Sequence, residues 1–100
     1  PMSVMMVRAK VKADRVAEVE AAVQAMFSAI ERAQPKGVRY ASSRLPDGVT
    51  YLILLGLEEG IENPLVAVPE FRAFQEGLKE WLAEPPISEP LTVVGSYNLF

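Results

Sequence analysis

Residues 49–57 read VTYLILLGL, and this stretch is apolar on both faces of any strand that it forms. Because side chains alternate along a strand, the odd-numbered residues from Val49 to Leu57 point one way, whereas Leu52 and Leu54 point the other. A strand with one face in water alternates apolar and polar residues instead. Both faces of this sheet therefore need cover, and we expect a second copy of the chain to supply part of it.

The residues before this stretch predict a strand, a helix and a second strand. Residues 4–11 alternate as a strand does, and Asp14 is the expected N-cap of a helix over 14–34. The apolar positions of that helix recur in steps of three and four, which makes one stripe of Val16, Val19, Val23, Met26 and Ile30. Glu20 sits off the stripe. Residues 38–45 form the second, more polar strand.

The turn Pro46-Asp47-Gly48 joins residues 38–45 to 49–57 as an antiparallel hairpin, because each of its residues favours a tight reversal. Residues 58–68 are the least regular segment. Pro69 suits the first turn of a second helix, PEFRAFQEGLKEWL, in which Gly77 is expected to admit another backbone closely. Residues 91–100 are the predicted last strand.

The order strand, helix, strand, strand, helix, strand is typical of the ferredoxin-like, split βαβ arrangement. We therefore predict one α+β domain over residues 1–100, with a four-stranded antiparallel sheet and both helices on one of its faces. The other face would carry a large apolar patch, which a monomer rarely exposes. Pairing two sheets face to face would bury it, so a homodimer is expected.

The composition restricts the possible chemistry of the protein more than it restricts the fold. The chain has 100 residues, a net charge of −3, and neither histidine nor cysteine. Zinc sites, Ser-His-Asp or Cys-His catalysis and His-ligated haem are excluded within one chain. The acidic charge argues against nucleic acid and anionic membranes. The absence of cysteine, of a long apolar run and of a visible signal peptide leads us to expect the cytoplasm.

With its elements in this order, the chain resembles the dimeric α+β barrel superfamily, and within it the antibiotic-biosynthesis-monooxygenase-like group. The resemblance is architectural and covers nearly the whole chain. It rests on strand 4–11, helix 14–34, the hairpin around Pro46-Asp47-Gly48, the Asn63-Pro64 loop, the helix PEFRAFQEGLKEWL and strand 91–99.

That group includes cofactor-independent monooxygenases of polycyclic phenols and quinol-like substrates, haem-degrading enzymes and small proteins of unassigned activity. The resemblance implies a homodimer with a substrate pocket between sheet and helices, and no cofactor. Haem-degrading members carry a histidine on the second helix, which this chain lacks.

The cofactor-free oxygenases commonly place Asn, Trp, Tyr and Arg in the pocket, so residue type suggests Asn63, Trp81, Tyr51, Tyr40 and Arg44 as substrate-binding residues. Each has a structural alternative. Asn63 before proline suits a turn, and Trp81 suits core packing with Phe74, itself a further candidate. The two tyrosines suit a dimer interface, and Arg44, like Arg39 on the opposite face of its strand, suits an ion pair.

Two further groups of residues allow more than one interpretation. Glu58, Glu59 and Glu62 favour a solvated loop over a cation site, because cation loops need a denser set of oxygens, and no metal is expected. Pro1, if its amine is free, resembles the catalytic base of tautomerases. Two main hypotheses follow: a cofactor-independent oxygenase of a small aromatic or polyketide-like molecule, and a non-catalytic small-molecule-binding dimer, with a Pro1-dependent tautomerase as the lesser alternative.

Overall fold

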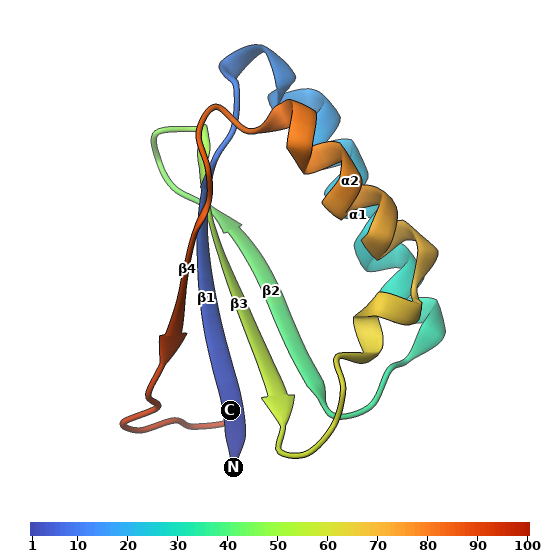
Figure 1. The fold of residues 1–100 in the computed structure, drawn as a ribbon, viewed down its shortest axis with the longest axis vertical. Helices are drawn as coiled ribbons and strands as arrows, with labels where there is room; N and C mark the ends of the chain where they lie inside the picture. The colour runs from blue at the N-terminus through green and yellow to red at the C-terminus, as the bar shows by residue number, and fades with distance from the viewer.

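Two helices cover one face of a four-stranded antiparallel sheet in the computed structural model, which describes residues 1–100 (Figure 1). The helices are α1 (Val16–Ala33) and α2 (Pro69–Trp81), and the strands are β1 (Met2–Lys10), β2 (Val38–Arg44), β3 (Thr50–Glu58) and β4 (Ile87–Leu91). The strand order is β2-β3-β1-β4. The predicted ferredoxin-like α+β fold is confirmed. Neither helix is long and apolar enough to cross a membrane.

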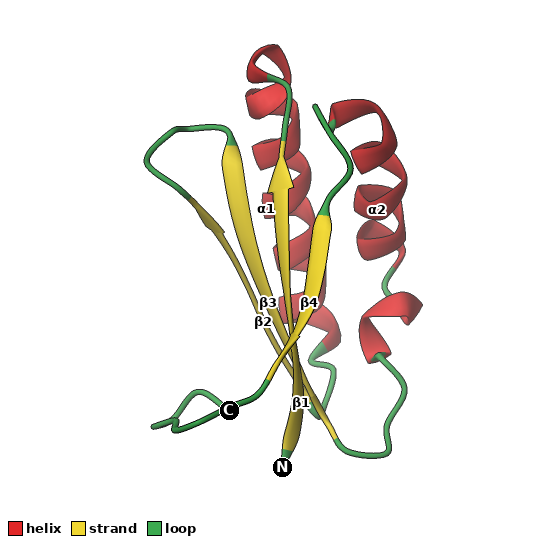
Figure 2. Ribbon diagram, turned by 60° about the vertical axis from the view of Figure 1, so that its left-hand side comes forward, coloured by secondary structure: helices red, strands yellow, loops and turns green.

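Strand β3 lies inside the sheet, where it pairs with β1 and β2. Its register therefore determines which side chains of these two strands point to each face of the sheet. Tyr51 lies opposite Ala9, and Leu55 lies opposite Tyr40. Tyr51, Ile53 and Leu55 pack in the core beneath the helices. Leu52 and Leu54 consequently point to the opposite side of the sheet, which we call the open face. No helix lies on that side (Figure 2).

The core lies between the helices and the sheet. Its most fully buried side chains are Met26 and Val19 on α1 and Leu65 in the short 3-10 helix Pro64–Ala67. The predicted stripe of α1 is confirmed, since the rest of it packs against the same cluster. Phe71 and Phe74 bring α2 onto this cluster.

The hairpin turn is held by the side chain of Asp47. Its carboxylate accepts hydrogen bonds from the backbone N–H groups of Val49 (3.0 Å) and Thr50 (2.8 Å) and from the Thr50 hydroxyl (2.5 Å). These bonds lower the pKa of Asp47, with the hydroxyl bond contributing most. Gly48 takes a positive φ of 79°, so the turn predicted from the sequence is confirmed.

The start of the first helix differs from the prediction. Asp14 is not an N-cap, because the chain first makes a 3-10 turn over Ala13–Arg15, closed by a 2.9 Å bond from the Arg15 N–H to the Lys12 carbonyl. The α-helix then begins at Val16 without a side-chain cap. The other predicted boundaries up to Trp81 differ by two residues at most.

The predicted position of the last strand is the larger error, because β4 covers Ile87–Leu91 rather than residues 91–100. Leu91 already lies opposite Val4, near the beginning of β1, so residues beyond it have almost no partner strand. Pro90 is tolerated because β4 is an edge strand. The segment 92–100 turns back instead, and the ring of Phe100 covers Gly56 on the open face.

Gly77 also has a different neighbour from the one expected. A Cβ at this position would lie 2.5 Å from the Trp81 indole, so the close approach comes from an aromatic ring one turn further along α2 and not from another backbone. The absence of a side chain at Gly77 lets the indole lie flat along its own helix.

Replacing Met26 with alanine should destabilise the fold by about 2–5 kcal/mol, because the change leaves a cavity where α1 meets the rest of the core. Chemical denaturation followed by circular dichroism measures the loss. The matched control is Val94→Ala, which removes an almost fully exposed side chain and should change stability by less than about 0.5 kcal/mol. Equal effects of the two changes would contradict this description of the core.

Candidate ligand-binding cavity

A cavity of about 190 Å³ lies between the helices and the sheet. Its wall is mostly apolar and is built from both helices, strands β1, β2 and β3, and the start of β4. The lining residues are Val7, Ala9, Val11, Val19, Val23, Tyr40, Ser42, Tyr51, Ile53, Phe74, Gln75, Leu78, Pro86 and Ser88. An apolar wall with a few polar groups is the usual composition of a small-molecule site.

Tyr51 is the polar residue of the wall whose side chain forms a hydrogen bond within the chain. Its hydroxyl donates a 2.7 Å hydrogen bond to Oε2 of Glu20 on α1, and the Arg44 guanidinium of β2 donates to the same oxygen. Three elements, α1, β2 and β3, are therefore tied together at one carboxylate. Arg44 is balanced by Glu20, so the pair brings no net charge to the cavity.

These bonds shift the pKa values of all three groups. The pKa of Glu20 is lowered, first by the Tyr51 hydroxyl and then by Arg44. The pKa of Tyr51 is raised, first by burial and then by the Glu20 carboxylate, which disfavours a second negative charge beside it. At neutral pH, Tyr51 is a neutral phenol whose proton is directed at Glu20.

Tyr40 occupies the wall differently. Its ring stacks on Phe27 at 5.1 Å between centroids and meets Phe71 edge-on at 6.1 Å. Burial alone raises the pKa of Tyr40 to about 12, and no hydrogen bond to a protein group contributes. Tyr40 is thus a rigidly held neutral phenol whose hydroxyl has no partner within the chain.

The structure brings together some of the residues suggested by the sequence and separates others. Tyr40, Tyr51 and Phe74 line the cavity, and Arg44 lies behind Tyr51. Trp81 does not line the cavity, since it packs at 6.1 Å against Phe74 and over Gly77. Asn63 lies elsewhere, and its side chain accepts the Leu65 N–H at 3.0 Å to cap the 3-10 helix Pro64–Ala67.

Sequence reasoning missed Glu20. This residue lies four positions after Val16 and three before Val23, so it borders the apolar stripe of α1, although its charge suggested a solvated position. A carboxylate at the edge of a core-facing stripe is a signal that a buried hydroxyl or cation lies opposite. The polar cavity residues Ser42, Gln75 and Ser88 carried no such signal.

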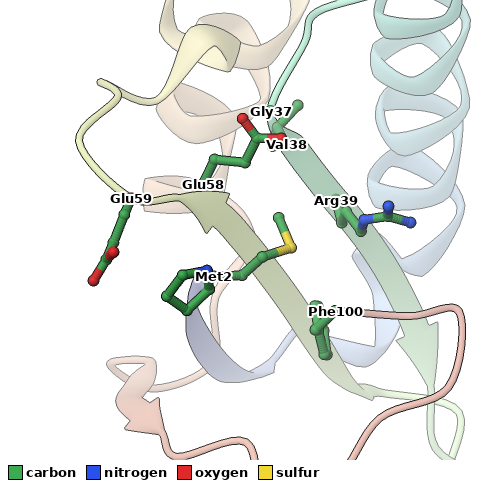
Figure 3. Close-up of a pocket in the computed structure, with 8 residues that line it drawn as sticks. Met2, Gly37, Val38, Arg39, Glu58, Glu59 and Phe100 are labelled. Carbon is green, nitrogen blue, oxygen red and sulfur yellow. The ribbon is translucent and has the colours of Figure 1, made fainter.

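A second, open hollow of about 640 Å³ lies at the far end of the sheet (Figure 3). It is lined by Pro1 and Met2, by residues 37–39, by Glu58 and Glu59, and by Phe100. Glu58 turns towards residues 37–38 and Glu59 points away, so the two carboxylates do not converge. No cluster of three or more acidic side chains is placed to hold a metal ion.

The fold is shared with several solved structures. No family model matches the sequence, and no curated protein matches it. Rv0793 from Mycobacterium tuberculosis superposes with a TM-score of 0.75 at 17% identity, over 96% of this chain and 98% of that one. Two proteins described as a "putative antibiotic biosynthesis monooxygenase" also match: one from Nitrosomonas europaea (TM-score 0.72, 16% identity, 93% and 90% covered) and one from Caulobacter crescentus (0.72, 19%, 94% and 91%).

The comparisons place the chain among ferredoxin-like α+β proteins covered by helices on one face of the sheet. More narrowly, the solved structures that share this fold include several described as a "putative antibiotic biosynthesis monooxygenase", the group to which the resemblance pointed. At these identities the likeness establishes the fold and leaves the activity to be tested.

Replacing Glu20 with glutamine should lower the pKa of Tyr51 towards its ordinary value near 10, because the carboxylate that disfavours the phenolate is removed. Absorbance of phenolate at 295 nm during a pH titration measures the shift. Tyr51→Phe removes the titration step that belongs to Tyr51 and so assigns it. The control is Glu18→Gln, on the same helix but bonded to Arg15 rather than to Tyr51. A titration curve that is identical in both glutamine variants would show that Glu20 does not contact Tyr51.

Proposed function

We propose that the chain is a homodimer that binds a small aromatic molecule in the cavity between helices and sheet, and that it acts as a cofactor-independent oxygenase. One observation carries this proposal: an apolar cavity whose wall holds two neutral phenols, Tyr40 and Tyr51, in different hydrogen-bonding states. The monooxygenase descriptions of proteins with the same fold support it. The location of the protein in the cytoplasm stays a prediction.

The residues suit a reaction in which the ligand supplies the electrons. With neither histidine nor cysteine in the chain, the protein's part is to orient the ligand, exclude water and stabilise developing negative charge. A phenolic ligand that binds uncharged can, once it has lost its proton, pass an electron to oxygen without a protein-borne redox group. The unpartnered hydroxyl of Tyr40 is our proposed donor to the ligand's oxyanion.

A second copy of the chain is the proposed partner. The open face presents Leu52, Leu54 and Met6 towards solvent, together with Ile87 and Leu91 of β4, which are 51% and 39% exposed. Apolar area of this kind on a two-sided sheet is typical of an interface. Pairing two open faces would bury it.

The non-catalytic alternative has its own support. Glu20 is the only carboxylate bonded to a cavity residue, and it is occupied by two donors, so no unoccupied base faces a ligand. Asn63 and Trp81, which the oxygenase hypothesis would place in the pocket, are used for capping and packing. A ligand-binding dimer without turnover would have these features. Pro1 lines the far hollow, so a tautomerase would need a separate site there.

Oxygen uptake separates these hypotheses. With 1,4-dihydroxynaphthalene as probe, the protein should consume oxygen above the spontaneous rate, and Tyr40→Phe should lower kcat by about 100-fold, because one oxyanion donor is removed. Tyr97→Phe is the matched control, since Tyr97 is 89% exposed in the C-terminal segment, and it should leave the rate unchanged. Binding of the probe without uptake above the spontaneous rate would favour the non-catalytic dimer.

The dimer is tested by sedimentation at micromolar concentration, which should give twice the 11.0 kDa chain mass. Leu54→Glu should yield monomers, because it places a charge at the centre of the open face, where the paired sheet would leave it unpartnered. Ala73→Glu adds the same charge on the exposed side of α2 and should leave the dimer intact. A single 11.0 kDa species for the unmodified chain would overturn the proposed assembly.

A further inference from the structure

The volume of the cavity limits the size of its ligand. At about 190 Å³ it exceeds the roughly 150 Å³ apolar cavity that holds one benzene ring. It falls short of the roughly 300 Å³ at which pockets for drug-sized ligands begin. A molecule of one substituted ring or two fused rings fits, and a molecule of three or more fused rings does not.

The charges around the cavity limit the ligand's charge. No side chain of the wall itself is ionised at neutral pH, because the wall contains no acidic or basic residue and its two tyrosines keep their protons. The adjacent guanidinium of Arg44 is already bonded to Glu20. An anionic ligand such as an aromatic carboxylate would lose its hydration and find no unpaired cation, so the wall selects against it.

The hydrogen bond from Tyr51 to Glu20 determines which polar group a ligand can place beside the Tyr51 hydroxyl. Because the Tyr51 proton is committed to Glu20 and the Arg44 guanidinium lies beside the same hydroxyl, only the remaining lone pair of the Tyr51 oxygen is left for a ligand. Tyr51 can therefore accept a hydrogen bond but not donate one. A hydroxyl on the ligand satisfies this oxygen, whereas a carbonyl or an ether in the same place does not.

We infer that the cavity selects an uncharged hydroxyarene of one or two fused rings, bound with its hydroxyl donating to Tyr51, and that Glu20 sets this polarity. This inference rests on the proposed ligand-binding function and goes beyond it. It makes polycyclic phenols of three or more rings poor ligands, in contrast to the substrates that the resemblance implied. Glu20 is here a positioning residue, since it acts through Tyr51.

Calorimetric titration under nitrogen tests the inference with four probes: 1-naphthol, naphthalene, 1-naphthoate and 9-phenanthrol. Removing the hydroxyl should weaken binding roughly 3- to 10-fold, the value of one hydrogen bond. 1-Naphthoate and 9-phenanthrol should bind at least about tenfold more weakly than 1-naphthol, because of charge and size respectively. Equal or tighter binding of either would overturn the inference.

Variants test the role of Tyr51. Tyr51→Phe should abolish the preference for 1-naphthol over naphthalene while leaving the affinity for naphthalene unchanged, and Tyr97→Phe should keep the preference. If Tyr51→Phe fails to fold, Glu20→Ala serves instead, since Glu20 is only half-buried. That change releases the Tyr51 proton, so 1-methoxynaphthalene should gain affinity relative to 1-naphthol. An unchanged ratio would contradict the assigned polarity.

The outcomes separate this inference from the proposed oxygenase. The expected binding order without oxygen uptake would support the inference and contradict the enzyme. Uptake with 9-phenanthrol as efficient as with two-ring phenols would support the enzyme and overturn the inference. Failure of all four probes to bind would overturn both the inference and the cavity's proposed role.

Discussion

Burial of both faces of β3 is the constraint on which the rest of the structure depends. The strand lies inside the sheet, pairs along its length with β1 and along most of it with β2, and sends apolar side chains to both sides. On the helix-facing side Tyr51 is buried, and Ile53 and Leu55 are partly buried against the same core. On the open face the C-terminal segment covers Gly56 with Phe100, but Leu52 and Leu54 are only partly buried. The fold thus covers one face of the sheet with helices and leaves the open face for the second copy of the chain that we propose.

The cavity is a consequence of how the first layer is filled. Large side chains such as Met26, Leu65 and Phe71 fill the space where the helices meet. Nearer the sheet, Ala9, Ser42 and Ser88 are small, so the helices and strands do not close on one another there. Close packing normally leaves few voids larger than a water molecule. A space of about 190 Å³ next to two phenols is therefore a feature that the core tolerates at some cost in stability.

The elements up to Trp81 were predictable because local signals and the global fold agree there. The stripe from Val16 to Ile30 and the turn at Asp47 each carry a period or a turn chemistry that allows one interpretation. The last strand was not predictable in this way. Its position depends on where β1 begins. Pro90 taken by itself predicts the end of a strand, although an edge strand such as β4 tolerates it.

The candidate site was predictable only by residue type. Tyr40, Tyr51 and Phe74 line the cavity in the structure, but the sequence holds no motif that distinguishes them from Trp81 or Asn63. What separates the two groups is a set of long-range contacts. The bond between Glu20 and Tyr51 joins residues 31 positions apart and exists only once α1 has docked on β3. Such a contact has no periodicity to detect.

The hydrogen bond between Tyr51 and Glu20 also connects the cavity to the open face of the sheet. Arg44 and Tyr51 reach Glu20 from β2 and β3, on the helix-facing side of the two strands whose opposite side forms part of the open face. A rigid sheet transmits the position of one face to the other, because successive side chains project from the same backbone. Leu52 and Leu54 flank Ile53 in β3, and Leu52 directly follows Tyr51, so packing of the proposed second copy on the open face would fix the strand that carries the Tyr51 hydroxyl. The placement of that hydroxyl in the cavity is thereby coupled to how the uncovered face of β3 is buried.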